Sequence, residues 1–387
     1  MESHHKLLWT ICIITLILST TSLILLIKSN PLNALITSEQ TSEPTDTSHL
    51  SYPIKSPKDR LPLQPTIKNN TKHFYLEASP IHWEYRTNQY LVAWAYNNQI
   101  PGPQIRVTEG DHVKITLKNS LPVPTSLHWH GLEVPYTQDG LPGITQQAIL
   151  PNQTYTYDFI AKPTGTRFYH THGSVHGDEA QQLDMGLSGA FIIEPKKEKQ
   201  QNKNNPITTN INQKPYDKEY TLLLDEWEIL PDGQNAANPI KTTNAKTSAA
   251  NTNTHSMNYN LYTINGRAFP DTEPIVVKEN DKILLRFINV GTSTTHPIHI
   301  HGHSFKIVAT DGNPVPLNAI ITKDTINIAP GERYDLELIA NNPGIWITHC
   351  HELHHADAGM VIPLIYEGYN INLSSMKNTN TISHDKH

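Results

Sequence analysis

The chain has 387 residues, which is enough for two ordinary domains or one large one. Charged residues make up 17% and apolar residues 37% of the chain, and the formal net charge is −6. This acidic balance argues against nucleic-acid binding, because a phosphate backbone is bound by a surplus of Lys and Arg. The chain has only two cysteines, so a disulfide framework is excluded.

The N-terminal segment predicts contact with a membrane. Residues 7–27 contain no charged side chain and are mostly apolar, and a bilayer core needs roughly 20 such residues in a helix. We therefore interpret residues 1–28 as a signal anchor, with a cleaved signal peptide as the alternative. Residues 29–70 are rich in polar residues and Pro without an apolar period, which predicts a flexible linker. The folded part is then expected outside the cytoplasm, either anchored to the membrane or secreted.

From residue 71 onward the sequence is typical of an all-β protein. Val113, Ile115 and Leu117 alternate with polar residues, which is the period of a half-buried strand. Similar short runs recur between turns rich in Pro and Gly, and this combination predicts a β-sandwich or barrel. These runs are Tyr155–Ile160, Lys282–Asn289 and Tyr334–Ala340.

An internal repeat divides the folded part into two halves, because each half contains two His-x-His pairs. Residues 197–215 are rich in Lys, Gln and Asn, and we interpret them as a linker between the halves. The prediction is a first domain over residues 71–196, a second domain over residues 216–370 and a disordered tail over residues 371–387. Residues 232–256 are interpreted as a long loop inserted early in the second half.

The His-x-His pairs are the first candidate functional feature. On a strand, residues i and i+2 face the same side, so each pair points two imidazoles into one space. Neutral imidazole binds copper, zinc, iron or nickel. A single pair is a weak signal, whereas four pairs in two duplicated sets are a strong one. The pairs are His128 and His130, His170 and His172, His299 and His301, and His349 and His351.

The only cysteine outside the N-terminal segment adds sulfur to the last pair. Cys350 separates the two histidines of that pair and is followed by His355 and Met360. A Cys, a His and a weak Met are the ligands of a blue-copper site when a second His joins them, and His296 is the candidate. The flanking histidines point to the opposite face, so an electron taken up at the thiolate has a through-bond path to metals bound there. An inert buried cysteine is the alternative.

Together these residues resemble the multicopper oxidases of the two-domain, laccase-like kind, over about residues 75–367. The resemblance implies two tandem cupredoxin-like Greek-key β-sandwiches. It also implies an enzyme that takes single electrons from a reducing substrate and reduces O2 to water. The resemblance rests on residues 128–131 (His-Trp-His-Gly), 139–146, 169–172, 264–266, 296–303 and 349–351 (His-Cys-His).

The resemblance further implies four coppers per chain. A type 1 copper is assigned the ligands His296, Cys350, His355 and, more weakly, Met360. A type 2 copper is assigned His128 and His299. A type 3 pair is assigned His130, His170, His172, His301, His349 and His351. Electrons are expected to arrive at His355 and Cys350.

The repeat also predicts where type 1 copper is absent. The positions of the first half that correspond to the four type 1 ligands are Thr125, Thr171, His176 and Leu187. Without sulfur this half should bind no type 1 copper, so we expect type 1 copper in the second half only. His176 is then interpreted as a structural group rather than a ligand.

A trinuclear cluster needs imidazoles from both halves. In two-domain members of the family the halves meet between neighbouring subunits of a homotrimer, and the resemblance implies the same here. Asp139 matches the family's proton-donating carboxylate, with an ordinary turn aspartate as the alternative. Glu352 and Asp357 are weaker candidates for this role. His303 and His354 are interpreted as packing or hydrogen-bonding groups.

The expected partners are O2, the membrane and a small reducing substrate, which is a phenol, an aromatic amine or a metal ion. Five methionines without a cluster argue against a dedicated pocket for Cu(I). A copper nitrite reductase is one alternative, but that class carries its type 1 cysteine in the first half and a mononuclear type 2 site. A non-enzymatic copper carrier is another, but it leaves eight histidines unexplained.

Overall fold

The structure is a computed structural model that describes residues 52–175, 177–196, 216–239 and 258–371. Strands dominate these residues, which confirms the all-β prediction. The helices of the described residues are short, and none of them is long and apolar enough to cross a membrane. They are α2 (Glu179–Asp184), α3 (Leu353–Asp357), η2 (Pro57–Asp59), η3 (Tyr136–Gln138) and η4 (Leu317–Ala319).

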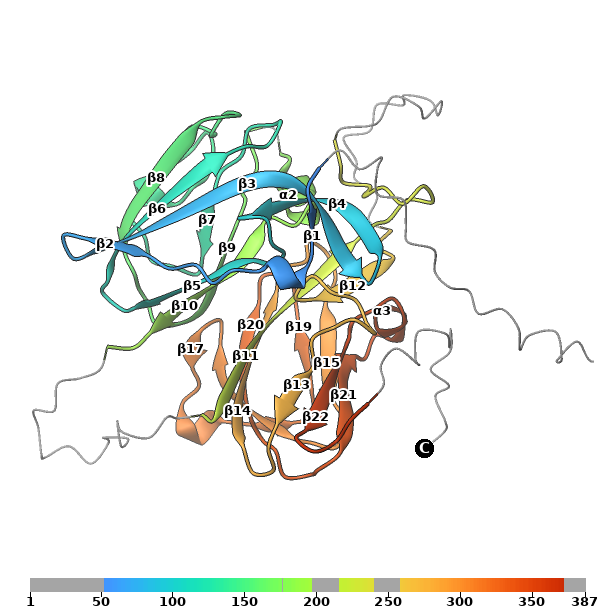
Figure 1. Ribbon diagram of the computed structural model, residues 1–387. Coiled ribbons are helices and arrows are strands. Elements are labelled where there is room, and N and C mark those ends of the chain that lie inside the picture. Colours follow the sequence, from blue (N-terminus) through green and yellow to red (C-terminus); the bar gives the residue numbers. More distant parts are fainter. Residues whose placement is uncertain (1–51, 176, 197–215, 240–257, 372–387) are drawn as a thin grey trace, which may run out of the picture. The chain divides into compact units, whose positions relative to one another are not determined.

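The first half consists of two sheets that enclose one core (Figure 1). Leu76 and Leu117 of the first sheet pack with Ile105 and Phe191 of the second. The first sheet contains β1 (Ile54–Lys55), β2 (Thr66–Lys68), β3 (Thr71–Arg86), β4 (Gln89–Tyr96), β6 (His112–Asn119) and β8 (Thr154–Ile160). The second sheet contains β5 (Gly102–Thr108), β7 (His128–His130), β9 (Gly165–His170) and β10 (Ser188–Glu194).

The second half repeats this arrangement. Leu285 and Leu336 of one sheet pack with Ile298 and Leu364 of the other. The first of these sheets contains β11 (Lys218–Trp227), β12 (Leu261–Ile264), β14 (Lys282–Asn289), β16 (Phe305–Thr310), β17 (Asn313–Pro314), β18 (Thr322–Lys323) and β20 (Arg333–Ile339). The other contains β13 (Ile275–Val277), β15 (His296–Ile300), β19 (Thr325–Ile328), β21 (Ile345–Cys350) and β22 (Val361–Tyr366).

The folded part begins earlier than the sequence predicted. Residues 29–70 were assigned to a flexible linker, but β1 and β2 pair with β3 at the edge of the first sheet. Backbone hydrogen bonds hold these short strands, so they need no apolar pattern. The predicted anchor (1–28), the linker 197–215 and most of the tail lie outside the described residues, as does most of the predicted loop 232–256.

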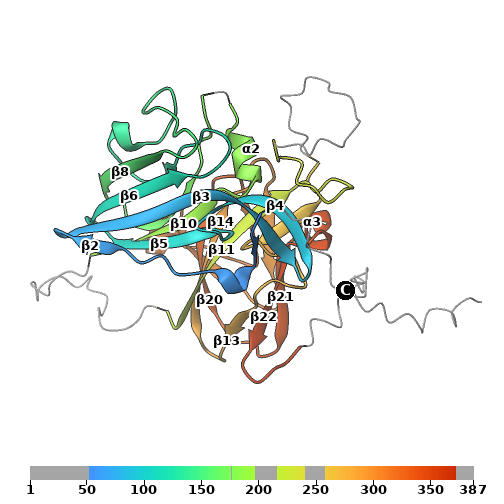
Figure 2. The same cartoon turned by 45° about the horizontal axis from the view of Figure 1, so that its top comes forward.

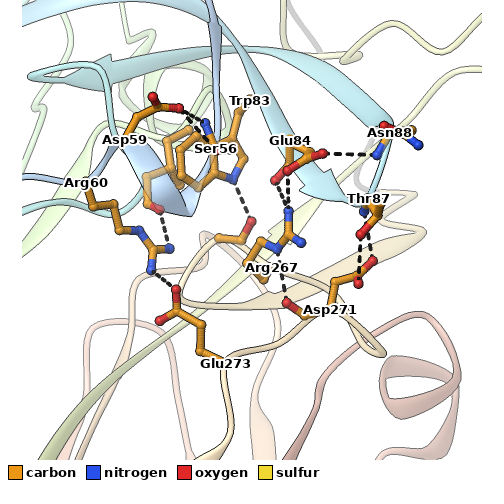
Figure 3. A network of polar contacts seen from close by, with 12 residues as sticks. Ser56, Asp59, Arg60, Trp83, Glu84, Thr87, Asn88, Arg267, Asp271 and Glu273 are labelled. Atoms are coloured by element: carbon orange, nitrogen blue, oxygen red, sulfur yellow. Dashed lines mark hydrogen bonds and ion pairs between the residues drawn. The ribbon is translucent and has the colours of Figure 1, made fainter. Parts of the chain in front are cut away.

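A third core and a polar network join the two halves. Trp83 of β3 packs with Trp227 of β11, and its Nε1 donates to the carbonyl of Gly266 over 2.6 Å (Figure 3). In the same network Arg267 donates to the carboxylate of Glu84 over 3.2 Å. The β3–β4 hairpin therefore ends beside β12 and α3 of the second half, as both ribbon views show (Figures 1 and 2).

Candidate metal centres

One sulfur and two imidazole nitrogens meet in the second half. The Sγ atom of Cys350 lies 3.5 Å from Nδ1 of His355 and 3.8 Å from Nδ1 of His296, and these two nitrogens are 3.3 Å apart. All three side chains are buried. A point equidistant from three atoms with these separations lies about 2 Å from each of them. This is close to the usual lengths of bonds from zinc to imidazole nitrogen and thiolate sulfur. The three side chains therefore fit one metal ion in a trigonal arrangement.

Two neighbouring strands and one short helix position these ligands. Strand β15 begins with His296, and its Ile298 lies opposite Cys350 of β21. The helix α3 follows β21 and brings His355 back over the sulfur. The amide of Cys350 donates to the carbonyl of Met360 over 3.1 Å, and the amide of Met360 donates to the carbonyl of His355 over 2.9 Å. The fully buried Met360 thus lies next to the predicted set.

Glu352 and Tyr262 hold the ring of His355 in place. The sequence did not indicate this role for either residue. Glu352 caps α3 by accepting from the His355 amide, and its carboxylate lies 3.1 Å from Nε2 of the same ring. The ring of Tyr262 stacks on His355 with centroids 4.0 Å apart. These contacts turn Nδ1 of His355 toward the sulfur. They leave the side chain 10% exposed, so a narrow edge of the imidazole reaches solvent.

Burial sets the protonation of these ligands. Burial lowers the pKa of His296 to about 3, so its imidazole is neutral and offers a lone pair to a metal ion. Burial raises the pKa of the Cys350 thiol to about 12. A metal ion that binds here must therefore displace the thiol proton, because the thiolate is the ligand.

The first half gathers imidazoles at the end of the strand pair β7–β9. His128 lies opposite His170, and the ligand nitrogens of His128, His130 and His170 lie within 4.8 Å of one another. Nδ1 of His128 donates to the carbonyl of Asp139 over 2.7 Å, and Nδ1 of His170 donates to that of Thr171 over 2.6 Å. Each ring therefore keeps the Nε2 lone pair free for a metal ion.

The fourth imidazole of this half is held by a carboxylate. His172 lies just beyond the end of β9, and its Nδ1 is 3.1 Å from Oε2 of Glu179 on α2. The strand argument did not identify Glu179, because a residue from a helix reaches this position only in the folded chain. Burial, reinforced by Arg333, lowers the pKa of His130 to about 3, so that imidazole is neutral.

The second half gathers the equivalent imidazoles at the end of β15 and β21. His299 lies opposite His349, and Nε2 of His301 is 3.0 Å from Nε2 of His349. The ring of His351 lies 5.7 Å from that of His299. Nδ1 of His349 donates to the carbonyl of Cys350 over 2.9 Å. The sulfur site and this imidazole set are thus linked by a hydrogen bond as well as by the chain.

Within one chain the two imidazole sets face different surroundings. The cavity beside His130 and His170 is bounded on its other side by residues 289–292 and 330–331 of the second half. The second-half hollow beside His299 is bounded by residues of its own half. In the described part of the chain, each group of three or more clustered metal-ligand side chains lies within one half.

A buried polar network occupies the first-half position of the sulfur site. The hydroxyl groups of Thr125 and Thr171 donate to Oε1 of Gln182 over 2.7 and 2.9 Å, and the two hydroxyl oxygens are 3.1 Å apart. All three side chains are fully buried. This network contains no sulfur or imidazole, which supports the prediction that type 1 copper belongs to the second half only.

The structure corrects one correspondence between the halves. The amide of Thr171 donates to the carbonyl of Leu187 over 3.1 Å, the same bond that Cys350 makes to Met360, so these two pairs correspond as predicted. The place of His355, however, is taken by Gln182 on α2. The sequence comparison assigned it to His176 because it counted forward from Thr171, whereas the insertion of the first half lies before the helix. His176 itself lies outside the described residues.

Asp139 lies beside His128, as the resemblance implied. Its carbonyl accepts the His128 hydrogen bond, and its Oδ1 is 3.5 Å from the same Nδ1. The next residue, Gly140, has a φ of +85°, and a Cβ there would lie 1.8 Å from the carbonyl oxygen of Leu127. Only glycine permits this turn. The Asp139 side chain is 38% exposed and so can exchange protons with water.

The remaining predicted residues lie away from the ligand nitrogens. His303 is buried and bonds the Tyr366 hydroxyl over 2.6 Å, so its predicted hydrogen-bonding role is confirmed. His354 and Asp357 are exposed on α3.

Two β-sandwich halves, a buried cysteine sulfur with two imidazoles, and a duplicated set of imidazoles are typical of a protein that binds several copper ions. The chain belongs to the multicopper oxidase family, whose description "Multicopper oxidase" matches residues 77–198 and 236–368. It is a copper-dependent oxidoreductase that takes single electrons from a reducing substrate and reduces O2.

Known proteins of this family are similar to the chain in sequence and fold. A blue copper oxidase from Nitrosomonas europaea is 34% identical with a TM-score of 0.62, over 76% of this chain and 86% of that one. A multicopper oxidase of Staphylococcus haemolyticus is 27% identical, over 76% of this chain and 88% of that protein. The cupredoxin-like fold is thereby confirmed. A copper nitrite reductase from Nitrosomonas europaea is 22% identical with a TM-score of 0.59, over 77% and 94% of the two chains, which shows the fold alone.

Proposed function

We propose that this multicopper oxidase is laccase-like and holds four coppers per chain. One is held by Cys350, His296 and His355 with Met360 beside them, and three are held by the eight paired imidazoles. The strand pair β15–β21 carries this proposal, because it places the sulfur on one face and His299 with His349 on the other. The hydrogen bond from His349 to the Cys350 carbonyl supports electron transfer between the two sites.

We further propose that the three-copper cluster forms between neighbouring chains of a homotrimer. The two imidazole sets face different surroundings within one chain, and each retains accessible members. Large apolar side chains are exposed in both halves: Tyr136 and Ile144 in the first, and Leu317 and Ile321 in the second. Such side chains are typical of surfaces that another chain covers. A cyclic head-to-tail contact would pair the first half of one chain with the second half of the next.

The residues of the chain have separate tasks in this reaction. Bound copper supplies one-electron acceptance at the Cys350 set and O2 reduction at the imidazole sets. The exposed edge of His355, held by Glu352 and Tyr262, faces the electron donor. Asp139 is a proton donor beside His128, because it lies at this imidazole and also contacts water. The neutral state of the buried imidazoles keeps their lone pairs available.

We propose phenols and aromatic amines as the main reducing substrates, with metal ions as a further class. The chain has only five methionines, which disfavours a dedicated Cu(I) pocket. We also propose that residues 1–28 anchor the enzyme to a membrane and that the folded part acts outside the cytoplasm. The support for this is the uncharged apolar run of residues 7–27.

Copper content, mass and O2 uptake of the full chain, produced with copper and solubilised in detergent, test the proposal together. We expect about four coppers per chain, a trimeric mass and O2 uptake with a phenolic donor. About two coppers per chain would favour a site like that of a nitrite reductase. One copper with a blue colour and no O2 uptake would favour an electron carrier.

A further inference from the structure

A cavity separates the first-half imidazoles from part of the second half. It has a volume of about 300 Å³ and is bounded by His130, His170 and one side of α2, including Glu179 and Leu183. Residues 289–292 form part of the opposite wall. A cavity of this size holds on the order of ten waters at liquid density. Hydrogen-bonded water can therefore connect its far wall with the imidazoles.

A buried carboxylate at the end of α2 is bonded to a residue of that far wall. Thr292 borders the cavity, and its hydroxyl donates to Oδ1 of Asp184 over 2.8 Å. Tyr259 donates to the other carboxylate oxygen over 3.0 Å, and its hydroxyl is 2.6 Å from that of Thr292. Asp184 is 94% buried, since its relative exposure is 6%. None of these three residues is a proposed metal ligand.

The surroundings of Asp184 favour its protonated form. Burial raises the pKa of Asp184 to about 7, and the negative charges of Glu226 and Glu228 add to the rise. The hydrogen bonds from Thr292 and Tyr259 act in the opposite direction. Glu226 is itself fully buried, and its Oε2 has no hydrogen-bond partner. Asp225, next to it on β11, also has its pKa raised by burial. Asp184 thus exchanges a proton near neutral pH, where an ordinary aspartate is already ionised.

We propose that Asp184 supplies protons for O2 reduction through the Thr292 hydroxyl and the water of this cavity. The inference rests on the proposed three-copper cluster at these imidazoles. Reduction of one O2 to two waters consumes four electrons from the donor and four protons. In each transfer the protonated Asp184 carboxyl donates to the Thr292 hydroxyl, the reverse of the direction in its ionised state, and gives it a proton while that hydroxyl passes its own proton to cavity water. The carboxylate then regains a proton from bulk water through the partly exposed Tyr259, whose hydroxyl bonds its other oxygen. Asp139 serves the other side, at His128.

Three variants of the full, copper-loaded enzyme test this route. Asp184→Asn keeps the shape and the acceptor for Thr292 but cannot give up a proton, and Thr292→Val removes the hydroxyl while leaving the carboxylate. We expect both to lower the rate of O2 uptake at saturating donor by about tenfold, with a larger solvent isotope effect. The rate of the wild type should fall as the pH rises through 7, and Asp184→Asn should abolish this limb. The control Asp225→Asn removes a buried carboxyl of the same region that does not line the cavity. It should change neither the rate of O2 uptake nor the solvent isotope effect.

A measurement without copper checks the titration itself. Because the folded pKa of Asp184 lies above that of the unfolded chain, its protonation stabilises the fold at low pH. This contribution is lost as the pH rises from about 4 to about 7. The melting temperature of the copper-free wild type should fall over this range more steeply than that of Asp184→Asn. If Asp184→Asn does not fold, Thr292→Val decides the outcome through its rate.

The outcomes separate this inference from the proposed function. Unchanged O2 uptake in both variants at full copper content would overturn the proton route and leave the oxidase intact. Loss of copper from Asp184→Asn would overturn it too, because the residue would then be structural. A wild type that takes up no O2 would instead refute the proposed function.

Discussion

Because the two imidazole sets lie apart within one chain, the place where the proposed three-copper cluster forms can be tested. One variant carries His128→Ala and His130→Ala, and a second carries His299→Ala and His301→Ala. Each variant alone has one incomplete set at every contact between chains, so neither should reduce O2. If the cluster forms between chains, a mixed assembly regains complete contacts wherever the first half comes from one variant and the second half from the other.

The expected recovery follows from this geometry. When equal amounts of both variants assemble at random, half of the contacts between chains have an intact first half. Independently of this, half of the contacts have an intact second half. About one contact in four is then complete, whatever the number of chains in a cyclic ring. Co-expression of the two chains with different affinity tags, followed by O2 uptake and copper content of the doubly purified assembly, measures the recovery. Double purification removes the assemblies of a single variant, so about one contact in three should be complete in the purified trimers. Two differently tagged copies of the same variant are the control. No recovery in assemblies that contain both chains would refute a cluster between chains.

Three further substitutions test the sulfur site, the turn beside His128 and the polar network of the first half. Cys350→Ser should remove the blue absorption and one copper per chain while the other coppers stay, as visible spectra and metal analysis will show. Gly140→Ala places a Cβ against the carbonyl of Leu127 and should cost about 2–4 kcal/mol in urea unfolding, whereas Gly233→Ala, which has open space, should cost about 1 kcal/mol. Gln182→Leu leaves two buried hydroxyls without their acceptor and should cost about 1–3 kcal/mol in the same assay without any loss of copper. A loss of copper there would contradict the absence of a metal from the first-half network.

Side-chain periodicity explains why most of the fold was predictable. In β6, Val113, Ile115 and Leu117 are buried and the residues between them are not, as the alternation predicted. The range Lys282–Asn289 was predicted to the residue. The edge strand Thr66–Lys68 was missed because all of its side chains are exposed. Its pairing depends on backbone hydrogen bonds, which leave no pattern in the sequence.

The grouping of the histidines was predictable for a related reason, and the residues that hold their rings in place were not. His299 and His301 face the same way because strand geometry places i and i+2 together. Glu179, by contrast, reaches His172 from a helix, and Tyr262 reaches His355 from another strand. Such contacts depend on how whole elements pack. The sequence assigned the wrong residue as the counterpart of His355 for the same reason. An insertion in the loop changes the number of residues between Thr171 and the helix without changing where the helix packs.

The equivalent helices α2 and α3 carry different residues in the two halves, and this difference is expected to give the halves different tasks. In α3 the residue at the equivalent position is His355, which lies at the sulfur and which we propose faces the electron donor. In α2 that residue is Gln182, which closes a polar network, and the two ends of the helix hold Glu179, which lines the cavity, and Asp184, which bonds Thr292 of the cavity wall. Substitutions in α3 should therefore change the uptake of electrons, whereas substitutions in α2 should change the delivery of protons to O2.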